Sequence, residues 1–153
     1  CEVRFAVRPA LRCSIHSELH RLLLSSADVT GQLIVWDAMS GEKVASMASS
    51  SAKPQPIIRM HWLDAQPGVL LCAYASGALR LWQIRPGSKS LMIWQCDLPE
   101  QPSLVAIDPF RGGRRLAVLS SKGTITQVSG LTATGPPAPG AASVVAQLGK
   151  LIP

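Results

Sequence analysis

The amino-acid sequence predicts an all-β fold built from repeated antiparallel units, and three observations support this. Glycines at positions 31, 77 and 123 recur every 46 residues, and a similar run of residues follows each one. Short apolar runs alternate with polar turns, which the 12 glycines and 12 prolines punctuate. The composition, with 47% hydrophobic and 16% charged residues, excludes wholesale disorder, because disordered chains combine low hydrophobicity with high charge.

The repeat is clearest in the run that each glycine opens. Residues 31–37 read GQLIVWD, residues 77–83 read GALRLWQ and residues 123–129 read GTITQVS. A second apolar run precedes each glycine, so each pair of runs is typical of two strands joined by a tight turn. Glycine suits such a turn because it reaches a positive φ without a Cβ clash.

Each predicted hairpin is flanked by further strand-like runs, which gives units of four strands. The expected strands are 3–6, 22–27, 33–36 and 43–47 in the first unit, 57–62, 69–75, 79–82 and 91–95 in the second, and 104–107, 116–119 and 124–128 in the third. The turns 37–41 and 85–88 join third to fourth strands. Segment 7–21, between the first two strands, is expected to be a long surface loop.

A period of 46 residues with Trp36-Asp37 at the end of a strand is the signature of a WD-repeat β-propeller blade. Over roughly residues 1–140 the sequence resembles the WD-repeat β-propeller family. The resemblance implies a partial propeller over residues 1–129, with two blades (about 1–50 and 51–97) and most of a third (98–129). Because a closed propeller has about four to eight blades, the remaining blades are expected elsewhere in the full-length chain. The start at Cys1 instead of Met also suggests a fragment or a processed product.

Six residues are predicted to hold the repeat together: Gly31, Trp36, Asp37, Gly77, Trp82 and Gly123. Trp36 is expected in the core. The sequence departs from ideal repeats, because Gln83 and Val128-Ser129 replace the Asp and the Trp-Asp of the second and third blades. These changes weaken the expected polar network but leave the hydrophobic pattern intact.

The C-terminal segment 130–153 is predicted to be a flexible Pro/Gly/Ala-rich linker. Residues 132–140 read TATGPPAPG, a composition that disfavours regular structure. The apolar residues that follow allow a short helix over 141–151, although Gly149 weakens that prediction.

No arrangement of residues predicts a catalytic, cofactor-binding or metal site. Cys13, His16 and His20 lie close in sequence, but zinc requires a fourth ligand and none is evident. His61 has Asp64 nearby but no recognisable nucleophile motif. The carboxylates of Asp28 and Asp37 are expected to form turn hydrogen bonds. A metal-dependent hydrolase at the propeller mouth, using His16 and His20, is the alternative function.

The chain is basic, with a formal net charge of +6. Arg111, Arg114 and Arg115 cluster at a predicted turn and are the candidate partner contacts; a second basic run contains Arg4, Arg8 and Arg12. Such surfaces suit acidic proteins or membrane surfaces. A nucleic-acid-binding module is a further alternative, although aromatic residues are only 5% of the chain and no nucleic acid is expected as a partner.

The function follows from the resemblance alone. Residues 26–37, 52–54, 108–110 and 121–125 occur in an order that resembles the N-terminal propeller of one family member. The resemblance implies a protein with two propellers that acts as a non-enzymatic scaffold for protein–protein interaction. This implies a cytoplasmic protein, peripheral at the trans-Golgi network and on cytoplasmic vesicles. Its implied partners are tethering-complex subunits and golgins that capture endosome-derived vesicles, with peripheral membrane association. A role in ciliogenesis and Hedgehog signalling is also implied. The four scattered cysteines, which form no CxxC pair, suit reduced thiols.

Overall fold

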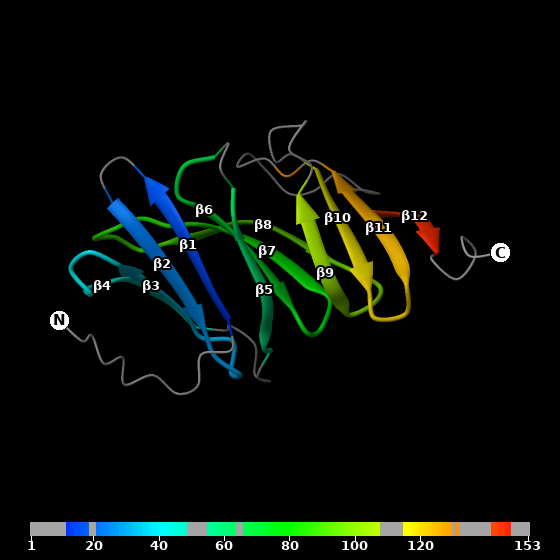
Figure 1. Cartoon of the computed structure of the whole chain (residues 1–153), viewed down its shortest axis with the longest axis horizontal. Coiled ribbons are helices and arrows are strands. Elements are labelled where there is room, and N and C mark those ends of the chain that lie inside the picture. The colour runs from blue at the N-terminus through cyan, green and yellow to red at the C-terminus, as the bar shows by residue number, and fades with distance from the viewer. Residues whose placement is uncertain are drawn as a thin grey trace.

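The computed structural model describes residues 12–18, 21–48, 55–63, 66–107, 115–129, 131 and 142–147. These residues form β-strands, turns and short connections, and none of them is helical. The strands make three separate four-stranded sheets, which lie side by side along the long axis of the molecule (Figure 1). In each sheet, neighbouring strands are consecutive in the chain and antiparallel, so each sheet is a meander.

The strands have the following bounds. The first sheet contains β1 (Arg12–Glu18), β2 (Arg21–Ala27), β3 (Leu33–Asp37) and β4 (Lys43–Met47). The second contains β5 (Ile57–Trp62), β6 (Val69–Tyr74), β7 (Ala78–Gln83) and β8 (Leu91–Asp97). The third contains β9 (Pro102–Ile107), β10 (Arg115–Ser120), β11 (Thr124–Ser129) and β12 (Ala142–Gln147). The prediction of an all-β chain of repeated four-stranded units is confirmed.

The turn between the second and third strand of each sheet has the same geometry three times. Gly31, Gly77 and Gly123 have φ values of 79°, 95° and 81°. The amide of each glycine donates a hydrogen bond to the carbonyl three residues earlier, with N–O distances of 3.1, 3.0 and 3.1 Å. An L side chain rarely adopts such a φ, which is why glycine recurs there with the period of the repeat.

The core lies in two layers, one on each side of the second sheet. One layer joins residues of the first and second sheets, including Leu23, Val35 and Leu70. The other joins the second and third sheets, including Leu81 and Val118. Every residue of β6 is buried, because this strand has a packed sheet on both faces. Its uninterrupted apolar sequence is the consequence.

The prediction that segment 7–21 is a long surface loop was wrong, and the strand predicted over 3–6 is untested. Residues 3–6 lie outside the described residues, and segment 7–21 is not a long loop, because β1 lies within it. β1 pairs with β2 in a regular register from Arg12↔Ala27 to Glu18↔Arg21. Without β1, the free edge of β2 would leave backbone amides and carbonyls without partners next to the core, which is costly.

The helix predicted over 141–151 was also wrong where the structure describes the chain. Residues 142–147 form β12, which pairs with β11 and completes the third sheet. The linker predicted over 130–153 therefore contains a strand. Val144 and Val145 are β-branched and favour a strand, and pairing satisfies the backbone groups along the edge of β11. The spacing of apolar residues over 141–151 is a local pattern, so it could not predict that this segment would pair with the edge of β11.

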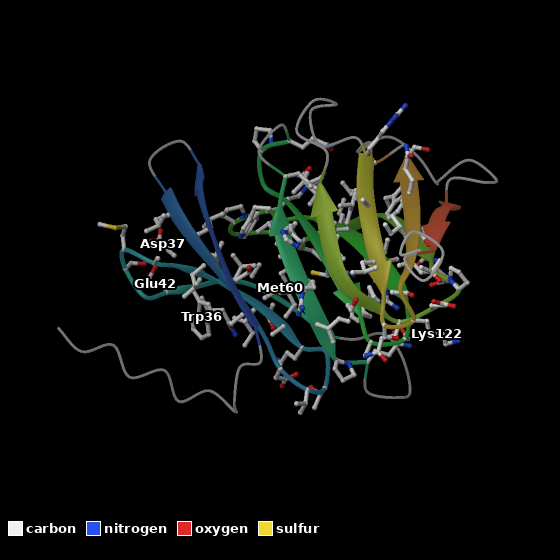
Figure 2. The ribbon with its side chains drawn as sticks, turned by 45° about the vertical axis from the view of Figure 1, so that its right-hand side comes forward. Trp36, Asp37, Glu42, Met60 and Lys122 are labelled. Atoms are coloured by element: carbon white, nitrogen blue, oxygen red, sulfur yellow. The ribbon has the colours of Figure 1, made fainter. Side chains whose placement is uncertain are left out.

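Trp36 is not a fully buried core residue, contrary to expectation. Its side chain is half-buried, and its indole N–H donates a hydrogen bond of 2.9 Å to Oγ of Ser26 (Figure 2). Ser26 itself is buried, at 7% exposure. This bond joins β2 to β3, whose residues Ser26 and Ile34 are paired. Trp82, one repeat later, is also half-buried but packs against the core between the first and second sheets.

Candidate interaction rims

The connections of the three sheets gather at two rims. We call the first the Gly31 rim: it contains the β2–β3, β6–β7 and β10–β11 turns, together with the connections between sheets. We call the second the Met39 rim: it contains the β3–β4 and β7–β8 turns, the β5–β6 turn and the start of β10. An antiparallel meander places successive turns at opposite ends of its strands, so each rim collects residues that are far apart in sequence. The β2–β3 and β10–β11 turns lie along the lower edge of the molecule in Figure 1.

Two carboxylates that sequence analysis singled out stabilise turns on different rims. Oδ1 of Asp28 accepts hydrogen bonds from the Thr30 amide (2.9 Å), the Thr30 hydroxyl (2.7 Å) and the Gln32 amide (3.0 Å). Oδ1 of Asp37 accepts from the amides of Met39 (2.9 Å) and Ser40 (3.2 Å). Because the two residues lie at opposite ends of β3, they do not form a catalytic pair.

The third sheet replaces Asp28 with Ser120. Oγ of Ser120 accepts hydrogen bonds from the amides of Lys122 (3.1 Å) and Thr124 (3.0 Å), which closes the β10–β11 turn. Glu100, in the connection to β9, lies against this turn, with Oε1 3.7 Å from Nζ of Lys122. A hydrogen bond from Ser120 and the charge of Lys122 lower the pKa of Glu100. The inter-sheet connection is therefore held to the turn by a carboxylate.

Glu100→Gln is expected to lower the stability of the chain at neutral pH and to flatten its acid dependence. The pKa of Glu100 is lower in the folded state than its ordinary value of 4.5. Its contribution is therefore complete above that value and is lost as the pH falls through the folded-state value. Urea unfolding midpoints from neutral pH down to pH values below that ordinary value measure the difference. Glu42→Gln, an exposed glutamate on the Met39 rim, is the control; equal acid dependence in wild type and Glu100→Gln would contradict this role.

In the second sheet, the position that corresponds to Asp28 holds an aromatic residue instead of a carboxylate. Tyr74, one repeat after Asp28, is fully buried, and the Arg80 guanidinium carbon lies 4.6 Å from its ring centroid. Burial raises the pKa of Tyr74, and it raises that of the buried thiol of Cys72 far above its ordinary range. A cation–π contact thus takes the place of the hydrogen bonds that the Asp28 side chain makes, while the amide of Ala78 donates to Oγ of Ser76 within the turn (3.4 Å). The raised pKa values disfavour the thiolate of Cys72 and the phenolate of Tyr74.

Two side chains connect the second and third sheets. Arg59 donates from Nη1 to the carbonyl of Ile58 (2.8 Å) and from Nη2 to that of Ser103 (2.8 Å), which lies on β9. Gln66 donates from Nε2 to the carbonyl of Leu131 (3.0 Å) on the Met39 rim. These bonds add directional contacts to the apolar layer between the sheets and fix their relative position.

His61 is half-buried on β5, two residues from Arg59. Burial, followed by the charge of Arg59, lowers its pKa, so the neutral imidazole is favoured. Asp64, the acid that sequence analysis placed nearby, lies outside the described residues. The described surroundings of His61 are those of a histidine packed in a sheet.

The predicted partner contacts are only partly described. Arg115 is half-buried at the start of β10, where it pairs with Ser129, whereas Arg111 and Arg114 lie outside the described residues. Cys13 and His16 lie on β1, with side chains that are not described, and His20 lies outside. Among the side chains that are described, no group of three or more His, Cys, Asp or Glu residues could hold a metal ion. The described part of the chain has no helix that is long and apolar enough to span a membrane.

The structure exposes apolar side chains on the Met39 rim that sequence analysis did not select. Met39 is 79% exposed, and Leu91 and Met92 are 40% and 44% exposed. Lys43, Arg85 and Lys89 are exposed beside them. The signal in the sequence was the position of Met39 inside a polar turn, where an apolar side chain has no sheet to pack against.

Comparison with known proteins identifies the fold and a set of relatives. No family model matches the chain. It is 32% identical over 131 residues to WD repeat-containing protein 11 of Danio rerio, which covers 84% of this chain, and 31% identical over 119 residues to the Homo sapiens protein of that name. The chain spans about a tenth of the length of these curated relatives, 10% and 9% respectively.

The solved structures that it resembles are WD40 propellers. The β-propeller domain of Myceliophteria thermophila Cps50 (Swd1) matches with a TM-score of 0.66 and 16% identity, covering 92% of this chain and 39% of that one. The WD40 domain of Toxoplasma gondii coronin matches with a TM-score of 0.57 and 15% identity, covering 71% of this chain and 28% of that one. The three sheets are therefore blades of a partial WD-repeat β-propeller, and the sequence is similar to WD repeat-containing protein 11.

Proposed function

We propose that this chain is part of a non-enzymatic scaffold that binds other proteins through the rims of its blades. The observation that carries the proposal is that polar side chains of the described residues hydrogen-bond to backbone groups of the blades. Asp28, Asp37 and Ser120 are engaged with backbone amides of their own turns, and Arg59 is engaged with backbone carbonyls. Such groups hold exposed turns in fixed positions, which lowers the entropic cost of binding a partner.

The finer role that we propose comes from the resemblance to WD repeat-containing protein 11. In this role the protein captures endosome-derived vesicles at the trans-Golgi network, with golgins and tethering-complex subunits as partners. It would be cytoplasmic and peripheral on that membrane and on vesicles, and would also act in ciliogenesis and Hedgehog signalling. Several blades with separate contact surfaces suit tethering, because simultaneous weak contacts raise the overall avidity.

Affinity purification of the tagged full chain at physiological salt, followed by quantitative mass spectrometry, tests this function. Enrichment of golgins and tethering-complex subunits is the expected result. The Gly77→Ala variant, in which the second blade is disrupted, is expected to lose these partners. The Gly87→Ala variant is expected to keep them, because that turn has room for a side chain. A different stable assembly would contradict the Golgi role but retain the scaffold, and recovery of no protein above background would contradict both.

A further inference from the structure

The Met39 rim combines positive charge with protruding apolar side chains. Lys43 begins β4, and Arg85 and Lys89 lie in the β7–β8 turn; all three are exposed. The exposed apolar side chains of Met39, Leu91 and Met92 occupy the same two corners of the blades. Among the carboxylates that the structure describes on this rim, that of Asp37 accepts two hydrogen bonds from its own turn, and Glu42 is exposed.

The Gly31 rim has the opposite character. Among the side chains that the structure describes on it, the carboxylates of Asp28, Asp97 and Glu100 outnumber the ammonium group of Lys122. Its large exposed apolar residue is Val29, at 47%. Among the described side chains, the three meanders thus place more of the positive charge, and three of the four large exposed apolar residues, on the Met39 rim.

The outer strands at the Met39 rim do not favour a peptide that binds as an added strand. Met39 lies in a turn that the carboxylate of Asp37 holds in place, and its side chain is 79% exposed; Asp37 is labelled in Figure 2. The outer strands beside it are poor templates for strand addition, because the β3–β4 and β7–β8 pairings each contain a bulge. The extra residues, Val44 and Ile93, lie on β4 and β8, and bulges on edge strands discourage pairing with another chain.

We infer that the Met39 rim docks onto an anionic lipid bilayer. Met39, Leu91 and Met92 enter the headgroup region, and Lys43, Arg85 and Lys89 contact lipid phosphates and carboxylates. Protruding apolar side chains surrounded by cations have this complementarity, because apolar insertion and attraction to anionic lipid add together. This inference does not depend on which protein partners the scaffold binds.

Co-sedimentation of the full chain with vesicles tests the inference. We expect binding to phosphatidylcholine vesicles that contain phosphatidylserine, weaker binding to pure phosphatidylcholine, and loss of binding as salt is added. Each cation near an anionic surface contributes about 1 kcal/mol, or about fivefold in affinity, so the triple variant Lys43→Ser, Arg85→Ser, Lys89→Ser should lose about 100-fold. Met39→Ser, which removes one inserted side chain, should lose about fivefold to tenfold.

The controls lie on the opposite rim. Lys122→Ser and Val29→Ser remove an exposed cation and an exposed apolar side chain from the Gly31 rim and should leave vesicle binding unchanged. Every variant should remain folded under the assay conditions, as urea unfolding beside the wild type checks; Lys122→Ser, which removes the ion pair with Glu100, is the variant expected to have a lower urea midpoint. Equal affinity for both vesicle types, or equal loss in the variants of both rims, would overturn the inference. So would binding of a polyglutamate peptide, competed by neither vesicle, because the partner would then be an acidic protein segment. Affinity purification with the Met39→Ser variant measures binding of protein partners separately, so a failure of the membrane inference is distinguishable from a failure of the scaffold function.

Discussion

Gly77→Ala is expected to destabilise the protein by about 3 kcal/mol, because it combines backbone strain with a steric clash. Gly77 has a φ of 95°, and a Cβ atom built there would lie 2.8 Å from the Leu98 carbonyl oxygen and 3.3 Å from that of Glu100. Both obstacles are backbone atoms of the connection between the second and third sheets. The Leu98 amide also donates a hydrogen bond of 2.9 Å to the Gly77 carbonyl, which keeps that connection close.

Gly87→Ala is the matched control for this prediction. Gly87 also has a positive φ, 74°, but a Cβ atom there would meet no atom within 4 Å. Only the conformational cost of about 1 kcal/mol is therefore expected. Urea unfolding of both variants, followed by tryptophan fluorescence, separates the two effects. Equal losses in the two variants would show that the close approach of residues 98–100 to the turn does not constrain Gly77.

Leu81→Ala is expected to cost about 3–4 kcal/mol. Leu81 is completely buried on β7, within the apolar layer between the second and third sheets. Its removal would leave a cavity that β7 cannot move to fill, since this strand is hydrogen-bonded to β6 on one side and to β8 on the other. The loss should also weaken the stacking of the two blades, because the residue belongs to their shared layer.

Leu91→Ala provides the comparison for Leu81→Ala, with the same chemical change at a site that is 40% exposed on β8. Its expected effect is within about 0.5 kcal/mol. Free energies of unfolding from urea titration give both values. A loss below about 1 kcal/mol for Leu81→Ala would mean that the apolar layer between the sheets is not packed as described.

The sequence was most informative where a residue type has one physical reason to recur. Gly31, Gly77 and Gly123 mark positions that need a positive φ, and their spacing gave the repeat and the hairpins. The continuous apolar run over 69–75 likewise predicted a strand, and the structure buries every residue of β6. These signals are local, so they can be recognised without knowledge of the tertiary structure.

Features that depend on distant pairing could not be predicted in this way. β1 and β12 are defined by the strand edges that they cover, and those edges exist only after the sheets form. Tyr74 occupies the position that Asp28 holds one repeat earlier, and its stabilising partner Arg80 becomes evident only across the hairpin. The charge difference between the two rims has the same origin, because the meander brings Lys43 and Lys89 to one end from separate sheets.

The proposed function depends on three consecutive four-stranded blades that stack as part of one propeller and present fixed rims. Cryo-electron microscopy of the full chain at side-chain resolution would show this stacking. We expect three neighbouring blades, with residues 142–147 forming the outer strand on β11 and the Arg59 guanidinium donating to the Ser103 carbonyl between the second and third blades. A helix at residues 142–147, or a second and third sheet that do not share an apolar layer, would contradict it.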